Sequence, residues 1–160
     1  MSNNLAVANA KAFGEVNSER VACFARNLIA QVPEPRDSRS ASVSSGAALY
    51  ALFLSEMAEI SDQPSLKVKA IEQLRWGAEL LDTEVLTSSL YQSAPGYAWV
   101  LNLIAAEHGL PWAEELLIDL DDLFFDSFRN AGGTLNIDLI NGVCGLLVYV
   151  VVNYPPECVK

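Results

Sequence analysis

The sequence predicts an all-α protein that forms part of an α/α toroid, with about three outer/inner helix pairs. Glycine-containing loops open an apolar helix three times, at Gly46, Gly96 and Gly142, and the spacings of 50 and 46 residues fall in the range of two-helix repeats. Amphipathic segments that carry nearly all of the helix charge lie between the apolar ones. One repeat therefore corresponds to one helix pair.

Three amphipathic segments are predicted to be outer helices with one side in water. In the second, apolar residues recur every three or four positions from Leu66 to Val85, and charged residues fill the other faces. The third places Asp119, Asp122 and Asp126 on one face, which we interpret as the solvated side of an outer helix. These carboxylates are not expected to bind calcium, because the glycine-bearing loop of a calcium site is missing. These segments span residues 18–32, 65–86 and 112–129.

Three apolar segments, residues 44–60, 93–109 and 138–154, are predicted to be inner helices. They are apolar nearly all round, which indicates burial on most faces. Each glycine loop precedes an inner helix, so the loops are expected at one end of the arc, where function would lie. The serines before these helices suit helix caps: Ser44, Ser45, Ser88, Ser89 and Ser93.

The glycines can be explained by backbone conformation and close packing, without a role in function. A residue without Cβ lets the chain take positive φ on leaving a loop and lets helices approach closely. Gly142 and Gly145 lie one turn apart and indicate a close-packing face. Packing and turn formation alone would explain each of these glycines, and their recurrence favours architecture over catalysis.

The stretch IDLINGVCGLLVYVV carries a motif that resembles a known family. Its Asp138, Gly142 and Gly145 are similar to the aspartate-x-x-x-glycine-x-x-glycine signature of the lanthionine synthetase C-like proteins. The other two repeats have Leu49 and Trp99 where a second glycine is common in that family. The resemblance extends over most of the chain, through the order and spacing of the repeats.

The resemblance implies a peptide cyclase, in which a cysteine thiol adds to a dehydroamino acid, on a toroid of about seven helix pairs. We expect residues 1–160 to form a single helical domain equivalent to the amino-terminal half of such a toroid. The family's zinc, held by two cysteines and a histidine, belongs to later repeats, so zinc is implied only for a complete member and this chain is expected to bind none. The isolated chain is then expected to be inactive.

Asp138 is the one catalytic candidate, and the resemblance implies an acid–base role for it. A carboxylate facing a cavity can exchange protons near neutral pH if desolvation raises its pKa. An aspartate shortly before an apolar helix also fits an ordinary N-cap, and both roles stay open. Asn141 and Tyr91 are placed at the same end of the arc without a defined role.

The three cysteines and the single histidine are interpreted as structural. Cys23, Cys144 and Cys158 are odd in number and far apart, which favours reduced thiols over a disulfide framework. Packing against apolar neighbours is the expected role of Cys23 and Cys144. His108, next to Gly109, is expected to end the second inner helix, where a cation is favourable.

Charge and hydropathy exclude several partners. Twenty acidic and ten basic residues give a formal net charge of −10, which argues against nucleic acid and anionic bilayers. The longest apolar run, Val143 to Val152, is about half of the roughly 20 residues that a membrane-spanning helix needs. The amino terminus lacks the pattern of a signal peptide, so we expect a cytoplasmic protein.

The open end of a three-pair arc predicts a partner. The segment GLLVYVVV would leave an apolar patch at that edge, so a second chain or a homo-oligomer is expected to cover it. Three hypotheses follow: the amino-terminal part of a peptide cyclase, a non-catalytic scaffold or peptide-binding module, and two arcs that close on each other. A carbohydrate-active toroid, which needs paired acids, ranks lower because Asp138 stands alone at a loop end.

Overall fold

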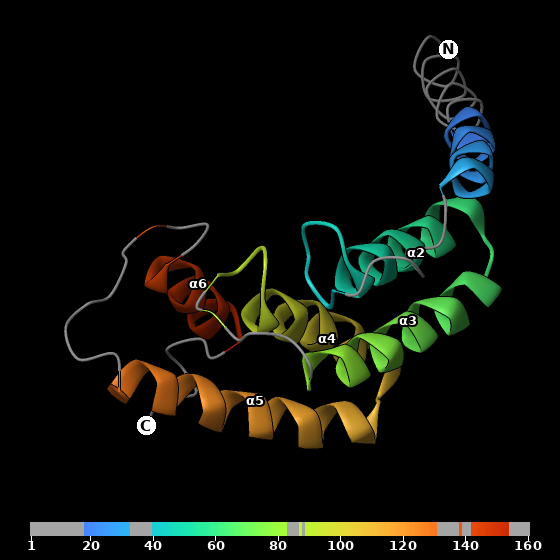
Figure 1. Cartoon of the computed structure of the whole chain (residues 1–160). Helices are drawn as coiled ribbons and strands as arrows, with labels where there is room; N and C mark the ends of the chain where they lie inside the picture. The colour runs from blue at the N-terminus through green and yellow to red at the C-terminus, as the bar shows by residue number, and fades with distance from the viewer. Residues whose placement is uncertain are drawn as a thin grey trace, which may run out of the picture.

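The computed structural model describes residues 18–32, 40–82, 87, 89–130, 138 and 142–153, and these residues form helices and loops without strands (Figure 1). The all-α prediction is therefore confirmed for this part of the chain. A first helix covers residues 18–31. The helices that follow are α2 (Ala47–Ser61), α3 (Ser65–Leu81), α4 (Ala94–His108), α5 (Pro111–Asn130) and α6 (Val143–Asn153).

The helices lie in two layers, as the alternation of apolar and amphipathic segments predicts. The apolar helices α2, α4 and α6 are neighbours in one layer, with α4 packed against both of the others (Figure 1). The amphipathic helices α3 and α5 form the second layer, where α3 packs on α2 and α5 packs on α4. Helices α2, α4 and α6 run in the same direction in Figure 1, and α3 and α5 run antiparallel to the inner helices that precede them.

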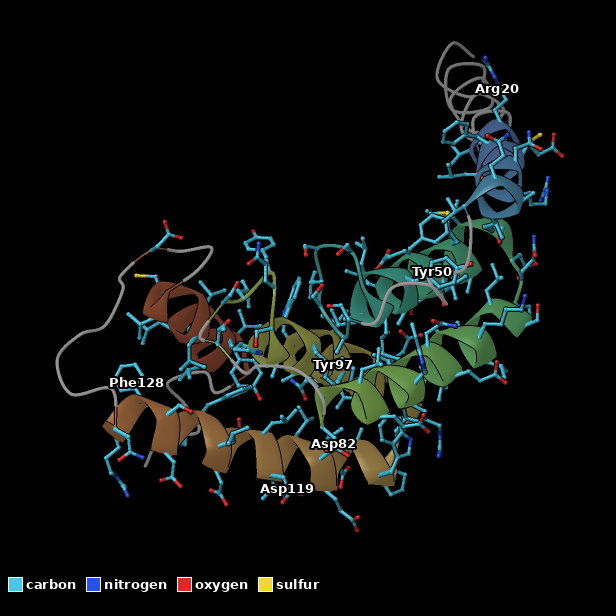
Figure 2. All side chains as sticks on the ribbon, in the orientation of Figure 1. Arg20, Tyr50, Asp82, Tyr97, Asp119 and Phe128 are labelled. Carbon is cyan, nitrogen blue, oxygen red and sulfur yellow. The ribbon has the colours of Figure 1, made fainter. Side chains whose placement is uncertain are left out.

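Burial separates the inner from the outer helices. Inner helix α4 buries nine residues, spread around its circumference, whereas α5 buries only Ala113, Leu120 and Phe124. The carboxylates of Asp119, Asp122 and Asp126 are exposed, as expected of a solvated outer face, and Asp119 points away from the inner layer (Figure 2). The core therefore lies between the layers and around α4.

Short turns join α2 to α3 and α4 to α5, so the outer helix follows the inner one in these hairpins, whereas the predicted outer/inner pairs place the outer helix first. Helix α2 ends at Ser61, and the C-cap residue Asp62, with a φ of 54°, turns the chain toward α3. Gly109 ends α4 with a φ of 59° and donates its N–H to the Ala105 carbonyl at 2.8 Å. His108 is the last residue of α4, where it was expected. The glycine loops thus connect successive hairpins.

The first helix contacts the rest of the molecule through few residues. Ala25 is buried and Ile29 packs against the core, whereas Val21 and Phe24 are 52% and 67% exposed. Cys23 is also exposed, so the prediction that it packs in the core was wrong. The sequence placed Cys23 on the apolar face, but the helix turns its alanine side toward the neighbouring helices.

One lysine links three helices at the surface. Lys67 of α3 forms ion pairs with Glu59 of α2 and with Glu107 of α4, the latter at 2.8 Å. Hydrogen bonds from the ammonium group to Glu107 and Glu59 raise the pKa of Lys67 to about 12, and the same bond to Lys67 lowers the pKa of Glu107. The cluster ties α2 and α4 to α3.

Candidate functional site

The glycine loops before α2 and α4 lie side by side. The backbone N–H of Ser44 donates to the carbonyl of Tyr91 at 2.9 Å, which joins the two loops directly. A Cβ on Gly96 would lie 2.7 Å from Cγ2 of Val43, so the first loop also packs on the start of α4. The expectation that these loops share one end of the molecule is therefore confirmed for the first two repeats.

Gly46 and Gly96 are required because neither position has room for a Cβ atom. A Cβ on Gly46 would lie 2.2 Å from the Ser40 carbonyl oxygen, and one on Gly96 would lie 1.8 Å from that of Leu90. Both distances are far shorter than a carbon and an oxygen can tolerate. The φ of Gly46 is −112°, so positive φ, the other role predicted for the loop glycines, is not the reason for this one.

The serines stabilise the loops more than the helix ends. Ser93 is at the N-cap of α4, but its Oγ accepts from the N–H of Thr87 at 2.8 Å and makes no capping bond. The Oγ of Ser89 accepts from the N–H of Gln92 at 3.0 Å. Helix α2 has Gly46 at its N-cap. The prediction that serines cap these two helices was therefore wrong, while Ser88 lies outside the described residues.

A buried tyrosine behind the loops fixes α4 against α3. The hydroxyl of Tyr97 donates to the carbonyl of Leu74 at 2.5 Å, and burial raises the pKa of Tyr97 well above its usual range (Figure 2). Gly77 makes room for the ring, because a Cβ there would lie 2.6 Å from Cε2 of Tyr97. This contact was not predicted from the sequence, although an isolated glycine in a helical pattern signals close approach.

The third loop carries the motif residues Asp138, Gly142 and Gly145. Gly142 and Gly145 are buried, and the N–H of Gly145 donates to the carbonyl of Gly142 at 3.0 Å. Asp138 is exposed and lies five residues before Val143, where α6 begins. Its position is therefore not that of an N-cap of α6. Tyr91 is 42% exposed, and Asn141 lies outside the described residues.

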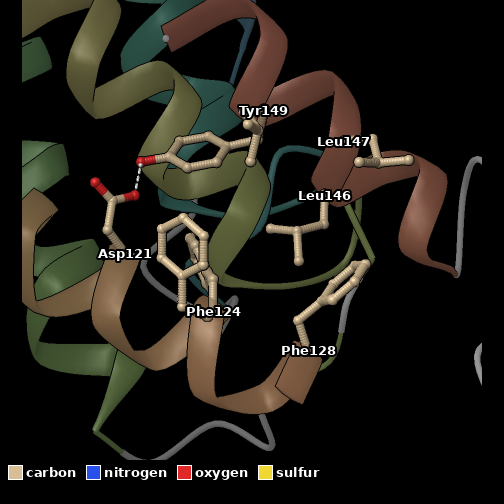
Figure 3. Close-up of a pocket in the computed structure, with 8 residues that line it drawn as sticks. Asp121, Phe124, Phe128, Leu146, Leu147 and Tyr149 are labelled. Atoms are coloured by element: carbon tan, nitrogen blue, oxygen red, sulfur yellow. Dashed lines mark hydrogen bonds between the residues drawn. The ribbon is translucent and has the colours of Figure 1, made fainter. Parts of the chain in front are cut away.

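A second candidate site is an apolar pocket between α5 and α6, with a volume of about 190 Å³ (Figure 3). Tyr149 forms its polar end by donating its hydroxyl to Oδ1 of Asp121 at 2.8 Å. The rings of Tyr149 and Phe124 meet edge to face, with centroids 5.4 Å apart. The pocket is lined by Asp121, Phe124, Phe125, Phe128, Leu146, Leu147, Tyr149 and Val150.

The zinc ligands of the resembled family have no counterpart among the described residues. Cys23 lies on the first helix, Cys144 on α6 and His108 at the end of α4, and no three His, Cys, Asp or Glu side chains of the described segments are grouped to hold a metal. Cys158 lies outside those segments. The described residues do not fit that zinc site.

Comparisons with known proteins do not assign this chain to a family. No family model, curated protein or solved structure matches this chain. Within the described segments, no helix has both the length and the apolar character that crossing a bilayer requires. A function must therefore be inferred from the geometry of the joined glycine loops and of the α5–α6 pocket.

Proposed function

We propose that this chain is a lanthionine synthetase C-like protein of the cytoplasm that lacks the family's zinc-binding half and handles a peptide at the end of the arc where its glycine loops lie. The observation that carries the proposal is the junction of the first two glycine loops, through the Ser44–Tyr91 hydrogen bond. The third loop, with Asp138, precedes an inner helix that runs in the same direction. Its motif is the one shared with the peptide cyclases.

The reaction would be the addition of a cysteine thiol to a dehydroamino acid. A C–S bond forms at the β-carbon as the π bond of the C=C double bond breaks. The thiol gives up one proton and the α-carbon takes up one, so no atom is gained or lost. Asp138 is proposed to exchange a proton in this addition, because a carboxylate at the peptide-handling end can serve as base and then as acid.

Loss of free thiol from a test peptide measures this activity. We would incubate the chain, alone and reconstituted with a zinc-loaded carboxyl-terminal half supplied as a second chain, with a peptide that contains one dehydroalanine and one cysteine, and then count alkylatable thiol by mass. We expect the chain alone to lose thiol at the buffer rate, because it lacks the zinc-binding half, and the reconstituted assembly to lose thiol faster, with slower loss when it carries Asp138→Asn. Asp119→Asn, an exposed carboxylate on the far face of α5, is the matched control. Thiol loss at the buffer rate in the folded, zinc-loaded assembly would contradict the proposal.

The second candidate is a non-catalytic helical scaffold that associates with itself. The observation that favours it is the exposed apolar surface of α6, formed by Leu147, Val148, Val151 and Val152 at 38% to 66% exposure. Such a patch on an isolated helix face is typical of an interaction surface. Light scattering over a range of concentrations tests it: a mass that rises toward two chains supports the scaffold, and a monomer throughout contradicts it.

A further inference from the structure

The pocket between α5 and α6 has a buried floor and an exposed rim. Phe124, Leu146 and Tyr149 form the floor and are 8%, 6% and 1% exposed. Phe128 and Leu147 lie at the rim and are 41% and 47% exposed (Figure 3). A small molecule can therefore enter from solvent past the rim and reach side chains that are shielded from water.

The volume of the pocket limits the size of a ligand. It is about 190 Å³, whereas pockets for drug-sized ligands measure roughly 300 to 1,000 Å³. An engineered cavity of about 150 Å³ in another protein, with leucine, isoleucine and phenylalanine walls, binds benzene. The size of the α5–α6 pocket therefore favours a compound of one ring or two fused rings over a peptide segment or a lipid chain.

The walls of the pocket favour an aromatic ligand. Phe124, Phe125 and Phe128 line it from α5, and Tyr149 lines it from α6. The rings of Phe124 and Tyr149 already meet edge to face, with an angle of 81° between their planes. Aromatic rings prefer edge-to-face and offset-stacked contacts, which stabilise a complex beyond the burial of their area. A third ring placed among these four can make contacts of the same kind.

The polar groups of the pocket favour a ligand without charge. Among the described residues that line it, Asp121 alone carries a charge, and its Oδ1 accepts the Tyr149 hydroxyl at 2.8 Å. These two groups point toward each other at one end, beside the space between Phe128 and Leu146 (Figure 3). A charged ligand would leave water for apolar walls, which is costly, and an anion would also meet the like charge of Asp121.

We propose that the α5–α6 pocket is a binding site for a small, uncharged aromatic compound of one ring or two fused rings. The ring lies on the floor formed by Phe124 and Leu146, and Phe128 covers it from the rim. The described residues that line the pocket come from α5 and α6 alone. The inference is therefore independent of peptide handling at the glycine loops.

Toluene and benzoate test the proposal, because they share a phenyl ring and differ in charge. We would titrate the full chain with each compound and follow the methyl chemical shifts of Leu146, Leu147 and Val150, which line the pocket. We expect saturable shifts with toluene and an affinity for benzoate that is at least about tenfold weaker, since its carboxylate must be desolvated near Asp121. Equal affinities for the two compounds would overturn the proposed ligand class.

Two substitutions locate the site and the origin of its selectivity. Phe128→Ala should weaken toluene binding at least about fivefold, because the ligand loses an aromatic contact at the rim. Phe24→Ala, at a 67% exposed position of the first helix, is the matched control and should leave the affinity unchanged. Asp121→Asn retains an oxygen that can accept the Tyr149 hydroxyl, so it should strengthen benzoate binding and leave toluene binding unchanged.

Circular dichroism should report an unaltered fold for Phe128→Ala, because this side chain is already partly in solvent. An absence of saturable toluene shifts in the folded wild-type chain would overturn the inference. It would also be overturned if Phe128→Ala bound toluene as tightly as the Phe24→Ala control. Neither result would bear on the thiol assay that tests the proposed peptide function.

Discussion

Single residues set how closely the helices of this protein approach. Gly96 admits the carbonyl of Leu90, and Gly77 admits the ring of Tyr97, at distances that a Cβ would not permit. These positions depend on tertiary approach, so periodicity alone does not reveal them. The repeated loop glycines were nevertheless visible in the sequence, because close approach recurs with the repeat.

Adding one methyl group at Gly96 should therefore be costly. We expect Gly96→Ala to lower the free energy of unfolding by about 1 to 3 kcal/mol, as overpacking does elsewhere. Denaturant titration measures the change, with Ala106→Ser, on the exposed face of the same helix, as a control of near-zero effect. Equal stability of Gly96→Ala and wild type would contradict the close approach of the Leu90 carbonyl.

The Tyr97 hydroxyl offers a second test. Tyr97→Phe removes a buried donor to the Leu74 carbonyl and should cost about 0.5 to 1.5 kcal/mol of unfolding free energy. Since burial keeps this phenol protonated well above its usual pKa, the loss should be the same from pH 6 to pH 9. Tyr91→Phe, at a 42% exposed loop position, should change little. If the two substitutions changed the unfolding free energy by similar amounts, the hydrogen bond from Tyr97 to Leu74 would not stabilise the fold as proposed.

At the scale of elements, the sequence predicted the helices and their order but not how they pair. Hydrophobic periodicity distinguished inner from outer helices, since an apolar circumference requires burial. The direction of pairing depends on turn length, and the short turns at Asp62 and Gly109 join inner to outer helix. The exposure of Cys23 could not be predicted because the face that a helix buries depends on its neighbours.

The ion pairs of Lys67 make the junction of α2, α3 and α4 sensitive to acid. Glu107 has a lowered pKa in the folded protein, so its contribution is present above the ordinary pKa of a glutamate and is lost as the pH falls through the folded value. Glu107→Gln should therefore lower the melting temperature at pH 7 and leave it unchanged at pH 2.5. Glu72→Gln, on the exposed face of α3, is the control. An equal lowering of the melting temperature at both pH values would show that the charge of the Glu107 carboxylate does not stabilise the protein.

At the scale of the whole molecule, two surfaces carry the proposed functions. The glycine-loop end was predicted from sequence because each loop precedes an inner helix, and the Ser44–Tyr91 bond places two of the loops together. The α5–α6 pocket was foreseen only as an apolar edge, since its polar end, formed by Tyr149 and Asp121, joins residues that are 28 apart in the chain. Contacts of that kind are set by packing and not by local pattern.

The most direct test of peptide handling is to map the amide chemical shifts of the labelled chain as it is titrated with the dehydroalanine–cysteine peptide. We predict saturable shifts that cluster in residues 40–46 and 89–93 and at Asp138, with few on the exposed face of α5. Shifts confined to the α5–α6 groove, or none at millimolar peptide, would contradict the claim that the glycine-loop end is where this protein meets its substrate.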